Sequence, residues 1–137
     1  AGVMPAHVIY DRVDPSPAGF SSFWLQQVLR QRIGFQGVIF SDDLNMQGAS
    51  VGGDYVSRAE AAVQAGCDMV LICNNRGAAI QILEKFRLQP NPVLHARLAR
   101  LHGRHPVSWE TLHNESAWRQ AVSALSELSD ESLSLLF

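Results

Sequence analysis

Two adjacent carboxylates, Asp42 and Asp43, lie just after the short apolar run Val38–Phe40, from which only Ser41 separates them. The run is β-branched or aromatic and is preceded by Gly37, which is typical of a buried strand. Burying carboxylates at the end of such a strand costs free energy unless they face solvent or a functional site. Parallel α/β folds place their chemistry at the carboxyl ends of their strands. On these residues alone, the pair indicates either an enzyme's carboxylate or a turn or helix cap.

The composition limits the classes of protein to which this chain can belong. The chain has 137 residues, of which 47% are hydrophobic and 18% charged, as expected for one globular unit. Its net charge of -2 gives no basic surface for nucleic acid. It contains no apolar run near the ~20 residues of a membrane span and no signal-peptide layout. Cys67 and Cys73 are expected to be free, buried thiols rather than a disulfide. We therefore expect a cytoplasmic protein with no nucleic-acid or membrane partner.

The elements that must position the carboxylates alternate between strands and helices. Strands are expected over three apolar runs: Val3–Ile9, Gly37–Ser41 and Met69–Cys73. Each is followed by a helical pattern, and this order recurs three times at a spacing of ~30 residues, which favours a parallel sheet. The helices are expected to begin with Ser21 as an N-cap, with the capping box Ser57 to Glu60, and at Ala78.

The strand–helix order stops after Gln89, and helices are expected over Val93–His102 and Ser108–Leu128. We therefore divide the chain into three β-α units, residues 1–88, and C-terminal helices, residues 89–137. Three units are too few for a barrel, which takes eight strands and about 250 residues. The chain also opens directly in a strand without an initiator Met, so we expect the C-terminal part of a longer protein.

Four segments resemble glycoside hydrolase family 3. They are Val-Met-Pro-Ala-His-Val at 3–8, Pro-Ala-Gly-Phe-Ser at 17–21, Gly-Phe-Gln-Gly-Val-Ile-Phe-Ser-Asp-Asp-Leu-Asn-Met-Gln-Gly-Ala at 34–49, and Ala-Gly-Cys-Asp-Met-Val-Leu-Ile-Cys-Asn at 65–74. More narrowly, they resemble the bacterial cytoplasmic β-N-acetylglucosaminidases of peptidoglycan recycling, over residues 1 to about 104. The resemblance implies an α/β fold, namely strands 6–8 and the following helices of a (β/α)8 TIM barrel.

The resemblance also implies roles for three side chains. Asp42 matches the nucleophile of a retaining glycosidase, which forms a covalent glycosyl-enzyme intermediate. Asp43 would then point away as a cap or a supporting residue, because successive strand residues alternate sides. His7 matches a position near the sugar, although a histidine after an apolar run is equally typical of a core. Met46 matches a residue lining the sugar pocket, although Met is also a common packing residue.

The general acid/base of this subfamily is a His-Asp pair on a loop earlier in the barrel, after a Lys-His-Phe-Pro-Gly-His-Gly motif. This sequence contains no such motif. We therefore expect the chain to be inactive alone and to need the missing N-terminal barrel half as its partner. The substrate implied is a GlcNAc-containing muropeptide, GlcNAc-1,6-anhydroMurNAc peptide, from which terminal GlcNAc is removed. No cofactor and no metal are expected.

Two other readings stay open. A family 3 β-glucosidase would share the fold, although Asp-Asp-Leu-Asn-Met at residues 42–46 differs from the Ser-Asp-Trp usual there. A non-catalytic α/β sugar-binding or interaction module would use Asp42 only to hold a loop.

Overall fold

The structure is a computed structural model that describes residues 2–89, 91–103 and 106–134, with side chains as far as residue 128. The chain divides into two compact units, residues 1–102 and residues 103–137. The boundary predicted at residue 88 is a division by element type and stays a prediction. The first unit contains the three strand–helix repeats and the adjacent carboxylates Asp42 and Asp43.

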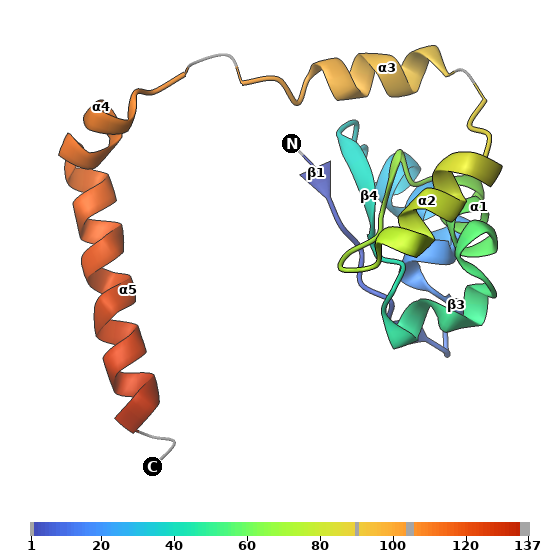
Figure 1. The fold of residues 1–137 in the computed structure, drawn as a ribbon, viewed down its shortest axis with the longest axis horizontal. Coiled ribbons are helices and arrows are strands. Elements are labelled where there is room, and N and C mark those ends of the chain that lie inside the picture. Colours follow the sequence, from blue (N-terminus) through green and yellow to red (C-terminus); the bar gives the residue numbers. More distant parts are fainter. Residues whose placement is uncertain (1, 90, 104–105, 135–137) are drawn as a thin grey trace. The chain divides into compact units, whose positions relative to one another are not determined.

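The main sheet is parallel, as the strand–helix order predicts. Its strands are β1 (Gly2–Val3), β4 (Val38–Asp43) and β5 (Met69–Leu71), in the order β1-β4-β5. The central strand β4 pairs with both neighbours in parallel (Figure 1). Val38 and Ile39 are fully buried, as a strand covered on both faces requires. The predicted α/β fold class is confirmed.

The single strand predicted over Val3–Ile9 is wrong. β1 ends at Val3, because Pro5 lacks the N–H that a continuing ladder needs. The chain then forms β2 (Ile9–Tyr10), which pairs antiparallel with β3 (Asp14–Pro17) in a separate two-stranded sheet. The strand predicted over Met69–Cys73 is also shorter, because β5 ends at Leu71.

Short and irregular helices follow β3 and β4. The turn η1 (Ala18–Phe20) leads into η2 (Phe23–Arg32), whose turns are wide: the Ile33 amide donates to Val28 O, five residues back. The predicted cap Ser21 accepts a hydrogen bond from Trp24 N at 3.1 Å, although η2 itself begins after Ser22. A 3-10 helix of six residues, η3 (Gln47–Gly52), follows β4.

The helix α1 (Tyr55–Ala65) begins two residues before the predicted capping box, so Ser57 is not its cap. Asp54 is the N-cap, and its Oδ1 accepts from Ser57 N at 2.8 Å. The helix ends at Gly66, whose φ of 124° favours glycine. α2 (Arg76–Lys85) and α3 (Pro92–Ala99) are capped by asparagines, and α1 and α2 lie side by side against the sheet (Figure 1).

The second unit consists of α4 (Trp109–Asn114) and α5 (Ser116–Ser134). One continuous helix over Ser108–Leu128 was the expectation, and it is wrong, because Glu115 adopts an extended conformation between the two helices. Ser108 does begin the first of them, since its hydroxyl accepts from Thr111 N at 3.0 Å. His113 lies between the rings of Trp109 and Trp118 at the junction.

The core of the first unit joins the sheet to its helices. Small side chains line the inner face of α1 and allow it to approach the strands closely. The buried cluster consists of Leu25, Ile39, Leu44, Ala59, Ala62, Ala65, Cys67 and Ile82.

A buried carboxylate connects the amino ends of β4 and β5. Asp68 binds Arg30 at 2.6 Å and Arg97 at 2.8 Å, and its side chain is only 6% exposed. Its Oδ2 also accepts from Ile39 N at 2.9 Å. Arg30 further donates to the carbonyls of Phe35 and Gly37. Burial lowers the pKa of Arg30, the nearby Arg97 lowers it further, and Asp68 opposes both effects.

Replacing Asp68 by alanine is expected to lower the free energy of unfolding by about 3–5 kcal/mol, because two arginines lose their carboxylate partner. Urea unfolding followed by circular dichroism measures this change. The control is Asp11→Ala at an exposed carboxylate, which is expected to change stability by no more than about 0.5 kcal/mol. Equal effects of the two substitutions would contradict a structural role for the Asp68 cluster.

The Asp54 cap makes part of the stability depend on pH. Hydrogen bonds from the Ser57 amide and then the Ser57 hydroxyl lower the pKa of Asp54 below its ordinary 3.8. A lowered folded-state pKa gives stability that is present above 3.8 and is lost as the pH falls through the folded value. Asparagine caps equally well but does not titrate.

At about pH 6, the urea midpoint of the wild-type chain is therefore expected to be higher than that of Asp54→Asn. The difference between the two midpoints is expected to shrink towards about pH 3. Measuring both proteins at each pH cancels the contribution of the other carboxylates. A difference that stays constant over this range would show that the charge of Asp54 does not stabilise α1.

Candidate active site

The strand that carries Asp42 is interrupted by a bulge. Phe40 pairs with Met69 and Asp43 with Leu71, so Ser41 and Asp42 of β4 oppose Val70 alone. A bulge bends its strand and changes the direction of the side chains beyond it, and bulges are common beside active sites. The simple alternation expected for Asp42 and Asp43 therefore does not hold through this part of β4.

Two side chains of β4 accept hydrogen bonds from the neighbouring segment at the bulge. The Ser41 hydroxyl accepts a hydrogen bond from Leu71 N at 3.0 Å. The Asp43 carboxylate Oδ1 accepts one from Cys73 N at 2.9 Å. We call Ser41 Oγ and Asp43 Oδ1 the bulge acceptors. They lie immediately before and after Asp42 in sequence, so the strand is fixed to its neighbour on both sides of this carboxylate.

Asp42 is half-buried at the carboxyl end of β4. Its Oδ1 accepts from the amide of Asp43 at 2.9 Å, which orients the carboxylate. Asp43 Oδ1 accepts a second hydrogen bond, from Asn45 N at 2.9 Å. The role expected for Asp43 as a cap or supporting residue agrees with these bonds. A carboxylate oriented at a strand end in this way is suited to attack an electrophilic carbon.

His7 lies beside the end of β4. Its Nε2 is 3.2 Å from the Asp43 carbonyl oxygen, and since a carbonyl only accepts, Nε2 is the donor. The ring packs 5.2 Å from Phe20, and a Cβ on Gly48 would lie 2.8 Å from His7 Cβ. His7 Nδ1 is buried and has no hydrogen-bond partner among the described residues. His7 thus packs against η1, through Phe20, and against η3, through Gly48. Its ring is hydrogen-bonded to the strand that carries Asp42.

Met46 also lies just after the end of β4, and the residue is 46% exposed. Its amide donates to the Asp43 carbonyl at 3.1 Å. The three residues predicted for the site, Asp42, His7 and Met46, therefore all hydrogen-bond to Asp43. The structure brings them together, while their individual roles stay predictions.

A polar group beside the candidate site contains two residues, Tyr55 and Asn45, that the sequence reasoning missed. Tyr55 donates to Asn45 Oδ1 at 2.9 Å, and the Asn75 amide reaches both Asn45 Oδ1 at 3.2 Å and the Tyr55 hydroxyl at 3.0 Å. Asn75 also caps α2 through Ala78 N. Tyr55 was missed because α1 was expected to begin after it. The available signal was that Asn45 and Asn75 each follow a strand end.

Arg58 fixes the segment that carries Met46. Its guanidinium donates to the Leu44 carbonyl at 2.7 Å and to the Gly53 carbonyl at 2.8 Å. It also lies 4.9 Å from the centre of the Tyr55 ring, a favourable cation–π position. Both ends of residues 44–53 are therefore attached to the first turns of α1.

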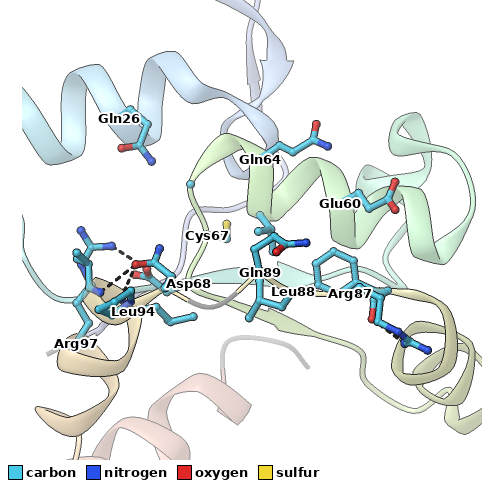
Figure 2. Close-up of a pocket in the computed structure, with 16 residues that line it drawn as sticks. Gln26, Glu60, Gln64, Cys67, Asp68, Arg87, Leu88, Gln89, Leu94 and Arg97 are labelled. Carbon is cyan, nitrogen blue, oxygen red and sulfur yellow. Dashed lines mark hydrogen bonds and ion pairs between the residues drawn. The ribbon is translucent and has the colours of Figure 1, made fainter.

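A cavity of about 780 Å³ lies away from this candidate site (Figure 2). Asp68 and Arg97 form part of its lining, and Asp68 directly precedes β5, so the cavity lies at the amino end of that strand. Figure 2 shows Gln26, Gln64 and Cys67 around it. Asp42 lies at the opposite, carboxyl end, where chemistry is placed in parallel α/β folds.

The two cysteines are free, as predicted, but only one of them is buried. Burial raises the pKa of the Cys67 thiol to about 12, and the neighbouring Asp68 adds to the increase. Cys73 is exposed, which corrects the expectation of two buried thiols. The reason is that β5 ends at Leu71 and leaves Cys73 in the following loop.

Among the residues that the structure describes, no group of three or more His, Cys, Asp or Glu side chains could hold a metal ion. Within the same residues, no helix is long and apolar enough to cross a membrane.

Curated relatives match nearly the whole chain. A beta-hexosaminidase of Thioalkalivibrio sulfidiphilus is 53% identical over 133 residues, which is 97% of this chain and 38% of the relative. A beta-hexosaminidase of Methylobacillus flagellatus is 54% identical over 92% of this chain and 36% of the relative. The chain thus spans well under half the length of these relatives.

Solved structures agree with these relatives. NagZ from Neisseria gonorrhoeae in complex with N-trifluoroacetyl-D-glucosamine superimposes with a TM-score of 0.74 at 37% identity. The match covers 93% of this chain and 36% of that protein. The model of the glycosyl hydrolase family 3 N terminal domain matches residues 1–101, which include both strand-end carboxylates. The chain therefore belongs to glycosyl hydrolase family 3, through its N-terminal domain.

Proposed function

We propose that this chain forms part of a retaining exo-β-N-acetylglucosaminidase and carries its nucleophile, Asp42. The observation that supports this most directly is the bulged end of β4, where Asp42 is half-buried between the two bulge acceptors. Relatives about half identical in sequence are named beta-hexosaminidases, and one similar structure holds N-trifluoroacetyl-D-glucosamine. Both point to an N-acetylated amino sugar as the residue that is cleaved.

In the proposed reaction, the Asp42 carboxylate attacks the anomeric carbon and forms a glycosyl-enzyme ester as the bond to the leaving oxygen breaks. An acid outside this chain protonates that oxygen and then, as a base, takes a proton from the water that hydrolyses the ester. Asp43 is not assigned this role, because its Oδ1 already accepts from two amides. His7 and Met46 are proposed to line the sugar pocket.

The proposed natural substrate is a muropeptide, GlcNAc-1,6-anhydroMurNAc peptide, handled in the cytoplasm during cell-wall recycling. This finer assignment rests on the resemblance of residues 3–8, 34–49 and 65–74 to that subfamily. We further propose that the chain supplies strands 6–8 of a barrel, that the remaining strands carry the acid/base, and that this chain alone turns over no substrate.

The proposal is tested by combining this chain with the complementary amino-terminal part of the Thioalkalivibrio sulfidiphilus relative and incubating them with a 5-fluoro GlcNAc inactivator. Mass spectrometry of peptides is expected to find the sugar on Asp42. Asp42→Asn is expected to abolish the adduct and to lower turnover of a GlcNAc glycoside by more than about 10³-fold, as loss of a covalent nucleophile does.

The matched control is Asp11→Asn, an exposed carboxylate that is expected to leave both readouts unchanged. Turnover that survives in Asp42→Asn, or an adduct on another residue, would contradict the assignment. Turnover by the chain alone, abolished by Asp42→Ala, would contradict the proposed need for a second part. Sugar binding without any adduct would favour the non-catalytic module.

A further inference from the structure

At the β4 bulge, two side chains of β4 accept hydrogen bonds from the amide of Leu71, the last residue of β5, and from the amide of Cys73 in the loop that follows. Ser41 Oγ accepts from Leu71 N at 3.0 Å, and Asp43 Oδ1 accepts from Cys73 N at 2.9 Å. Ser41 is fully buried, so its hydroxyl needs a hydrogen-bond partner, and Leu71 N provides one. The two acceptors therefore stabilise the bulged conformation itself.

We infer that Ser41 and Asp43 are positioning residues for Asp42, each required as a hydrogen-bond acceptor and neither as a charge or an acid. This inference rests on the proposed function of Asp42. With the backbone fixed at residues 41 and 43, the Cα of Asp42 has little freedom to move between them. Displacing a reacting group by about 1 Å is enough to cost about 10²-fold in rate.

Asp43 extends this positioning to the rest of the candidate site. Its amide donates to Asp42 Oδ1 at 2.9 Å, and its carbonyl accepts from His7 Nε2 at 3.2 Å and from Met46 N at 3.1 Å. The Asp43 carboxylate thus helps to fix the backbone of a residue whose N–H and C=O groups bond to three predicted site residues. Loss of its bond to Cys73 N would shift all three together.

The alternative is that the charge of Asp43 acts on the neighbouring Asp42. Asparagine separates the two ideas, because its side-chain oxygen accepts the same bonds without a charge. Asp43→Ala is expected to lower kcat by about 10²-fold with a smaller change in KM. Asp43→Asn is expected to restore most of that rate and to leave the pH profile of kcat/KM in place.

These rates are measured on the two-part enzyme, with Asp42→Asn alongside and the exposed Ser50→Ala as a matched control for Ser41→Ala. If the proposed function fails, the fluorosugar gives no adduct on Asp42 in any protein. If only the positioning inference fails, the adduct forms on Asp42, but Asp43→Asn loses as much rate as Asp43→Ala, or Asp43→Ala loses none.

Amide hydrogen exchange in this chain tests the same inference without activity. Asp43→Ala is expected to accelerate exchange at Cys73 N and not at Leu71 N, while Ser41→Ala does the reverse. Both amides should exchange at wild-type rates in Ser50→Ala. Unchanged exchange at both amides in Asp43→Ala and Ser41→Ala, or equal acceleration over the whole sheet, would overturn the inference.

Discussion

The pairing of β4 with β5 depends on side chains at both ends of the two strands. At their amino ends, the Asp68 carboxylate accepts from Ile39 N. At their carboxyl ends, Ser41 Oγ accepts from Leu71 N of β5, and Asp43 Oδ1 accepts from Cys73 N in the following loop. These side-chain bonds join the two segments at the β4 bulge. The position of Asp42 is a direct consequence of that bulge.

The two ends of the sheet have different tasks. At the amino end, Asp68 and the two arginines attach η2 and α3 to the strands, in a site whose charges are satisfied by one another. At the carboxyl end, carboxylates and amides are arranged around Asp43 and are partly open to solvent. This division matches the general rule that parallel α/β folds are stabilised at one face and carry chemistry at the other.

Much of this architecture could be predicted from the sequence, because the apolar runs and glycines mark strand–helix units and the carboxylates follow a strand. The bulge could not, because the partners of Ser41 and Asp43 are amides 30 residues away. The start of α1 was also ambiguous in the sequence. Ser57 and Glu60 match a capping box, yet Asp54 caps the helix. Pro5 and Glu115 each interrupt an element that the hydrophobic pattern alone continues.

The most direct test of this account is a crystal structure of the two-part enzyme after reaction with the fluorosugar. The account predicts continuous density from the Asp42 carboxylate to the anomeric carbon. It also predicts that Ser41 Oγ and Asp43 Oδ1 still accept from Leu71 N and Cys73 N. A sugar attached to another residue, or an Asp42 adduct in which both of these hydrogen bonds are broken, would contradict it.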